Sequence, residues 1–183
     1  MLLNDPQFVE AARALAERCL EVPQLRQPAA ALLDVVYESV DDPRNLVRIL
    51  EIRLEGSEDE DHKRELLHRI ATLRDERLKD DAGAFEALRV LMPLEPDDGG
   101  IRARLLEVGQ RLGEHEKLAE ALLATAERTS VPSVRGEILM LAGNLYRDRL
   151  DDSRRAEKVY QEVLAIDRHR AGLRARRPVD LLR

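Results

Sequence analysis

The sequence predicts an all-α protein, an αα-superhelix or solenoid of about four and a half helix pairs. Three observations carry this prediction. Apolar residues recur at helical spacing along most of the chain, and the apolar pattern of 33–98 recurs in 105–170. No alternating run of β-branched residues between turn residues predicts a strand. Because each helix has a single apolar stripe, it needs a neighbour on which to bury that stripe.

The clearest pair of helices lies in residues 134–167, where an Asp-Asp pair separates two apolar stripes. An Asp before a helix is a good N-cap because its carboxylate accepts hydrogen bonds from the free N–H groups of the first turn. We therefore expect a second helix to begin after each such point. The four predicted turns are Asp41-Asp42, Asp80-Asp81, Gly113-Glu114 and Asp151-Asp152.

The repeat becomes visible when the chain is shifted against itself so that 33–98 lies over 105–170 without a gap. Few residues are identical, but the apolar positions coincide almost throughout. This is expected when only the packing stripe is repeated. The first helices of successive pairs end at Val40, Leu78, Leu112 and Leu150. Such even spacing, with two helices per unit, is typical of a helical solenoid.

Residues 112–126 and 141–167 resemble tetratricopeptide repeats (TPRs), a resemblance that extends over roughly 28–167. It implies an αα-superhelix. The sequence departs from the family pattern in having no tryptophan, and Arg168 stands where a proline is expected. The residues that match are Leu141, Gly143 and Tyr146 on the first helix and Ala156, Tyr160, Ile166 and Asp167 on the second.

We expect a leading single helix in 1–27, acting either as a cap or as the second helix of a unit cut from a longer chain. Four TPR-like pairs follow in 28–57, 58–97, 98–129 and 130–167, and an Arg-rich C-terminal cap or tail occupies 168–183. The helices are expected at 5–21, 28–40, 43–55, 62–78, 80–93, 101–112, 114–128, 133–149, 152–166 and 169–176.

The composition fits such an array. Charged residues make up 36% and aromatic residues 3% of the chain, which suits thin layers of helices better than a large globular core. The net charge is −6, although residues 168–183 hold six arginines and one aspartate. An acidic body is unlike a nucleic-acid groove, so no nucleic acid is expected. A lone Cys19 and the lack of a signal peptide or an apolar span favour a cytoplasmic protein without membrane insertion.

No catalytic or metal-binding constellation stands out. His62 and His68 are six residues apart, whereas helical metal pairs need a spacing of three or four. Gly99-Gly100 precedes a helix but lacks the rest of a phosphate-binding fingerprint. We therefore predict no enzyme, no cofactor and no metal site.

The resemblance to TPRs implies that the first helices line a concave groove that binds a peptide or helix. Asn144 matches an asparagine with which some family members hold a peptide carboxylate, but Met140 stands where a lysine is wanted. The candidate partner-binding residues are Glu65, His68, Thr72, Asp75, Glu107, Gln110, Arg111, Met140, Asn144 and Arg147.

The predicted function is a non-catalytic protein–protein interaction scaffold, part of a longer bacterial repeat protein. Three alternatives stay open. The chain is a structural spacer or oligomerisation segment, which an exposed apolar end at 5–21 would favour, or it is a sensor for a small ligand. The third alternative is nucleic-acid binding through the Arg-rich tail, which predicts a steep dependence on salt. The expected partner is a protein or peptide, and a homo-oligomer through the terminal helices is possible.

Overall fold

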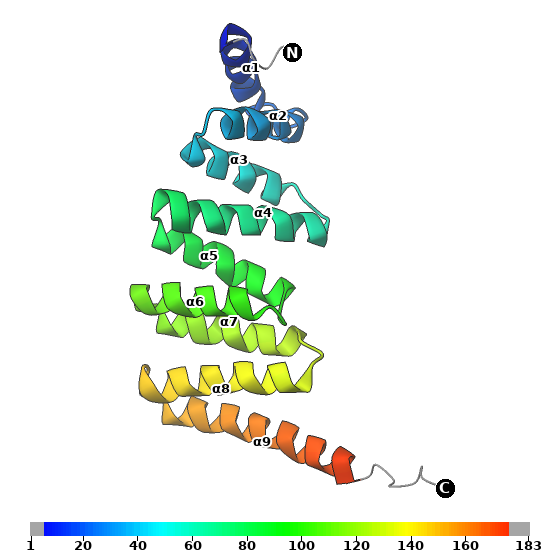
Figure 1. Cartoon of the computed structure of the whole chain (residues 1–183), viewed down its shortest axis with the longest axis vertical. Coiled ribbons are helices and arrows are strands. Elements are labelled where there is room, and N and C mark those ends of the chain that lie inside the picture. Colours follow the sequence, from blue (N-terminus) through cyan, green and yellow to red (C-terminus); the bar gives the residue numbers. More distant parts are fainter. Residues whose placement is uncertain (1–5, 176–183) are drawn as a thin grey trace, which may run out of the picture. The chain divides into compact units, whose positions relative to one another are not determined.

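The computed structural model describes residues 6–175, which form helices joined by turns and contain no strand (Figure 1). The predicted all-α class is therefore confirmed for this part of the chain. The chain divides into two compact units, Met1–Leu91 and Met92–Arg183. The boundary between them falls inside the predicted pair 58–97.

In the first unit each helix packs on the next along the chain. The first helix of the predicted pair 28–57, α2, lies against α3 and is also tied to α4 by side-chain hydrogen bonds. Leu33, Leu50 and Leu66 are buried between these helices. The elements are α1 (Pro6–Cys19), α2 (Arg26–Ser39), α3 (Pro43–Glu55), α4 (Glu60–Thr72), the π-helix η2 (Leu73–Leu78) and α5 (Asp81–Leu91).

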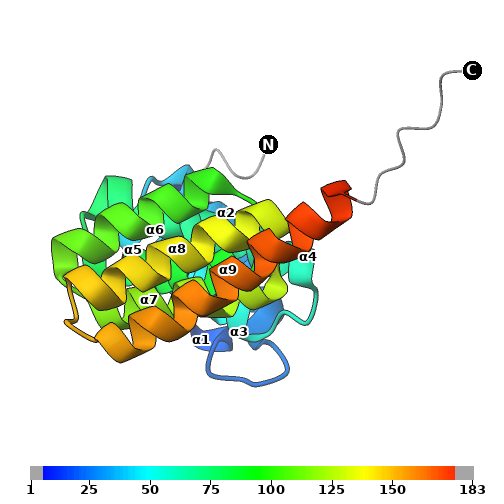
Figure 2. The same ribbon diagram turned by 90° about the horizontal axis from the view of Figure 1, so that it is seen from below.

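The second unit is built in the same way. Helices α8 and α9 run side by side (Figure 2), and α7 packs on α8. Leu118, Leu122, Ile138 and Ala156 are buried among them. The elements are the 3-10 helix η3 (Met92–Leu94), α6 (Gly99–Leu112), α7 (His115–Arg128), α8 (Pro132–Asp148) and α9 (Ser153–Ala175).

The predicted Asp caps are confirmed at three turns. The Asp carboxylates accept from the amide three residues later, at 3.1 Å in Asp42, 3.0 Å in Asp80 and 2.9 Å in Asp152. Each cap follows a residue in the left-handed region, and these residues are Asp41 (φ 54°), Lys79 (φ 53°) and Asp151 (φ 50°). In the remaining turn, Gly113 takes a positive φ of 72°.

The predicted helix 62–78 does end at Leu78, but its last part, residues 73–78, winds as a π-helix. Buried Ala29 and Leu33 of α2 correspond to buried Leu66 and Ile70 of α4. The caps that follow, Asp42 and Asp80, are one residue further apart than these corresponding positions. The second segment thus holds one extra residue, and its last part winds as a π-helix. Helix α8 has the same spacing from Ala142 to the cap Asp152, but it ends as an α-helix at Asp148 and leaves the extra residue in the turn.

The C-terminal prediction also needs correction. A helix ending at 166 and a second one at 169–176 were expected, but α9 continues from Ser153 to Ala175. No proline interrupts this stretch, since Arg168 replaces the proline of the family pattern. Of the predicted Arg-rich cap or tail 168–183, residues 176–183 lie outside the described residues.

Candidate functional site

The four predicted groove residues of the first unit lie on α4 and η2. Glu65, His68 and Thr72 are spaced three and four apart on α4, so they share one face of that helix. Glu65 is exposed, and its carboxylate lies 3.7 Å from the imidazole Nδ1 of His62. Asp75 lies within the π-helix, so it leaves the helical register of the other three. The structure therefore groups three of these four residues.

The predicted residues on α6 are exposed, and two of them pair with each other. Arg111 donates to Glu107 at 3.0 Å, a pair one helical turn apart. Gln110 lies beside them and is exposed. Such a surface pair contributes little to stability, so its side chains are easily released to a partner.

On α8, two predicted groove residues, Asn144 and Arg147, contact a residue of α9 that was not among the predicted site residues. Tyr160 of α9 donates its hydroxyl hydrogen bond to Asn144 Oδ1 at 2.9 Å, and its ring lies under the Arg147 guanidinium at 5.9 Å. The ring approaches this closely because Gly143 has no side chain, and a Cβ there would lie 2.5 Å from Tyr160 Cε1. Asn144 is thus held by Tyr160 before any peptide carboxylate arrives.

Charge at the same place is already paired. Arg147 donates to Asp148 at 2.6 and 2.9 Å. This hydrogen bond lowers the pKa of Asp148 below its ordinary value and raises the pKa of Arg147. Both groups are at the surface, where solvent screens the pair. The pair therefore offers a partner a local dipole rather than a free cation.

Met140 lies beside a shallow hollow of the second unit. The hollow has a volume of about 630 Å³ and is lined by side chains from α6, α8 and α9. Arg102 of α6 reaches across it to within 3.9 Å of Glu137 on α8. Of the predicted residues, Met140 alone borders this hollow.

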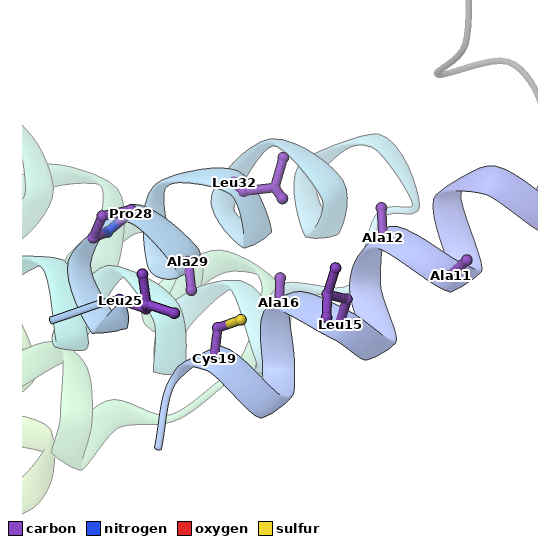
Figure 3. Close-up of a pocket in the computed structure, with 9 residues that line it drawn as sticks. All are labelled: Ala11, Ala12, Leu15, Ala16, Cys19, Leu25, Pro28, Ala29 and Leu32. Carbon is purple, nitrogen blue, oxygen red and sulfur yellow. The ribbon is translucent and has the colours of Figure 1, made fainter. Parts of the chain in front are cut away.

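A strongly apolar depression lies between α1 and α2 of the first unit (Figure 3). We call it the apolar groove, and its volume is about 480 Å³. Among its lining side chains only the thiol of Cys19 bears a polar atom. The residues of the apolar groove are Ala11, Ala12, Leu15, Ala16, Cys19, Leu25, Pro28, Ala29 and Leu32.

The apolar groove has a floor of small side chains and walls of large ones. Ala16 and Ala29 are buried where α1 meets α2. Leu15 on α1 is 64% exposed and Leu32 on α2 is 46% exposed. Val35 continues the exposed apolar row one turn beyond Leu32. A small ligand site needs several converging polar groups, and the described lining offers only one thiol.

Only half of this site could be expected from the sequence. The segment 5–21 was expected as an exposed apolar end, whereas the residues of α2 were expected to pack in an ordinary helix pair. The overlooked signal is a second apolar row that starts at Leu25, the residue before α2, and continues on α2 with Leu32 and Val35 beside the core row of Ala29, Leu33 and Val36. A helix with two apolar rows buries one row against its neighbours and leaves the other row exposed.

Neither a family model nor a curated protein matches the chain. None of the helices in residues 6–175 has the length and apolar character needed to cross a membrane. Within the described residues, no three His, Cys, Asp or Glu side chains gather closely enough to hold a metal ion.

Proposed function

We propose that this chain is a non-catalytic scaffold of TPR-like helix pairs that binds other proteins. The apolar groove is the observation that carries the proposal. Leu15, Leu25 and Leu32 are exposed and form one continuous apolar patch. Patches of this kind on a protein surface mark sites of interaction with other proteins. The paired and exposed polar residues on α4, α6 and α8 would set specificity and association rate rather than affinity.

Affinity capture from a lysate of the source organism tests this function. Four forms of the chain are compared: wild type, a groove variant (Leu15→Glu with Leu32→Glu), a face variant (Glu65→Lys, Asn144→Ala and Arg147→Glu), and a control. The control is Leu164→Glu, because Leu164 is also an exposed leucine in mid-helix, at 52%. Circular dichroism checks that each form is folded.

We expect at least one protein to be retained by wild type and control and lost from the groove variant, the face variant or both. Retention of the same proteins by all four forms would contradict the scaffold function.

The same exposed row also favours a second function, self-association of the chain as a spacer or oligomerisation segment. Sedimentation equilibrium separates the two. A molecular mass that rises with concentration for wild type and for Leu164→Glu, but not for the groove variant, would support self-association.

A further inference from the structure

We propose that the apolar groove binds one amphipathic helix of a partner protein, placed against α1 and α2 as α2 itself is placed against α3 and α4. This inference rests on the proposed scaffold function and names the kind of partner that one of its surfaces accepts. The partner helix presents large aliphatic or aromatic side chains along one row, including the position that faces Leu32.

The arrangement of helices within each unit supplies the template. Helix α2 packs on α3, and its Asp34 accepts from Arg69 of α4 at 2.7 and 3.0 Å. In the second unit, α6 likewise packs on α7 and approaches α8 through Arg102 and Glu137. A first helix thus lies between its own second helix and the next first helix. The corresponding place beside α1 and α2 is the apolar groove.

Helix α1 takes the role of a second helix in this scheme. Its Glu17 accepts hydrogen bonds from Arg48 of α3 and Tyr37 of α2. The contact between Glu116 of α7 and Arg155 of α9 likewise joins consecutive second helices. Within residues 6–175, no first helix covers the face that α1 and α2 share.

The residues of α2 at this face differ in kind from their counterparts on α4. The register that places Ala29 on Leu66 also places Leu25, Leu32 and Val35 on His62, Arg69 and Thr72. On α4 these positions are polar, and Arg69 meets the buried Asp34, which is 4% exposed. A helix opposite Leu32 must therefore have an apolar residue where α2 has Asp34, because an unpaired buried carboxylate is costly.

The size of the surface favours one helix over a second copy of the chain. A stable protein–protein dimer buries about 20–30 residues on each side. The apolar groove is lined by nine described residues, and Val35 continues its exposed row by one turn. A helix with anchors at positions i, i+3 or i+4, and i+7 fits a groove of this kind. Its large side chains would fill the space above Ala12, Ala16 and Ala29.

A pair of labelled peptides tests the occupant. Both contain residues 24–42, are stapled between positions 31 and 35, which are exposed on α2, and carry Leu25→Gln and Leu32→Gln to make the outer face polar. One keeps Asp34 and the other carries Asp34→Leu. Fluorescence anisotropy measures their binding to the full chain, as wild type, Leu32→Arg, Leu15→Glu and the control Leu164→Glu.

We expect the Asp34→Leu peptide to bind wild type and Leu164→Glu about tenfold more tightly than the Asp34 peptide, since the carboxylate would face Leu32 without a partner. Leu32→Arg recreates the pair of Asp34 with Arg69, so the preference of the two peptides should reverse. Leu15→Glu should weaken both complexes.

Three results would overturn the proposal: no binding of either peptide to wild type, a preference unchanged by Leu32→Arg, or a dimer of the free chain that Leu15→Glu dissociates. The last result would assign the groove to a second copy. If neither peptide binds but the face variant still loses proteins that the wild type captures from the lysate, the scaffold function stands. Only the proposal that the groove binds a helix would then be wrong.

Discussion

At the scale of single residues, three turns between paired helices share a two-residue motif. A residue with a positive φ is followed by an Asp that caps the next helix, as in Lys79 with Asp80 and Asp151 with Asp152. The first residue reverses the chain, and the second satisfies an amide that the helix leaves unpaired. This two-residue motif therefore defines where the next helix begins.

The cap at Asp42 predicts a pH-dependent stability. Hydrogen bonds from the Asn45 side chain and then from its amide lower the pKa of Asp42 below the ordinary value of 3.8. A carboxyl with a lowered folded pKa stabilises the protein above its unfolded pKa, and this contribution is lost as the pH falls through the folded pKa. Asp42→Ala should cost about 1 kcal/mol at pH 7.

Urea unfolding of wild type and Asp42→Ala between pH 7 and pH 2.5 measures this difference, which should shrink below pH 3.8. Asp42→Asn keeps a capping oxygen that does not titrate and serves as the control. A difference between wild type and Asp42→Ala that is constant with pH would contradict the cap assignment.

The positive φ at Lys79 predicts a stabilising substitution. A side chain in the left-handed region is strained, and glycine relieves this strain although it adds freedom to the unfolded chain. Lys79→Gly should raise the free energy of unfolding by about 0.5–1 kcal/mol. Lys79→Ala keeps the strain and should give no gain. Thermal unfolding of wild type, Lys79→Gly and Lys79→Ala measures these differences. Equal stabilisation by Ala and Gly would show that backbone strain at residue 79 is not the cause.

At the scale of helices, α2 is joined to two neighbours by one buried carboxylate. Asp34 accepts from Arg53 of α3 and, through both oxygens, from Arg69 of α4. The hydrogen bond to Asp34 raises the pKa of Arg69, although burial opposes this shift. Both arginines remain charged when the carboxylate is removed, so their loss of a partner is costly.

Asp34→Ala should therefore lower the free energy of unfolding by about 2 kcal/mol, an amount moderated by the partial exposure of both guanidinium groups. The control is Glu10→Ala, which removes the surface pair with Arg13 (2.6 Å) and should change stability by less than about 0.5 kcal/mol. Chemical denaturation measures both. Similar effects of the two substitutions would show that the buried carboxylate has no special role.

The contact of α8 with α9 predicts an intolerance to large side chains. Ala156 is buried against α8, as Ala84 is buried in the first unit. Ala156→Phe or Ala84→Phe should overpack these contacts and cost about 1–3 kcal/mol each. Exposed Ala165 provides the matched control, because Ala165→Phe should leave the melting temperature nearly unchanged. Unchanged melting curves for both buried sites would mean that the repeat register is wrong.

Most helices could be predicted from the sequence because apolar spacing and Asp caps are local signals. The predicted bounds 43–55 of α3 agree with the structure. The π-helix η2 escaped prediction because α8, with the same spacing from Ala142 to Asp152, ends without one, so the spacing does not signal it. The hydrogen bond from Tyr160 to Asn144 could not be predicted, because it joins side chains 16 residues apart and depends on the absence of a Cβ at Gly143.

At the scale of the whole chain, the described helices of each unit contact their neighbours along the sequence. Where contacts are this local, the stability is a sum over helices and adjoining interfaces, and we expect a local defect to stay local. Asp34→Ala should therefore accelerate amide hydrogen exchange in α2, α3 and α4 and leave the protection of α8 and α9 unchanged. Hydrogen exchange followed by mass spectrometry measures this, and equal acceleration in both units would indicate that they open together.

The extra residue within η2 has a consequence for how the chain tolerates changes in length. Arg74 lies in this segment and bridges Glu51 of α3 and Asp80 at the next cap. The surplus is taken up before the capping aspartate, in the π-helical turn here and in the turn after Asp148 of α8, and the following helix begins at its aspartate in both places. A segment before such a cap can therefore differ in length by one residue while the next helix keeps its capped start.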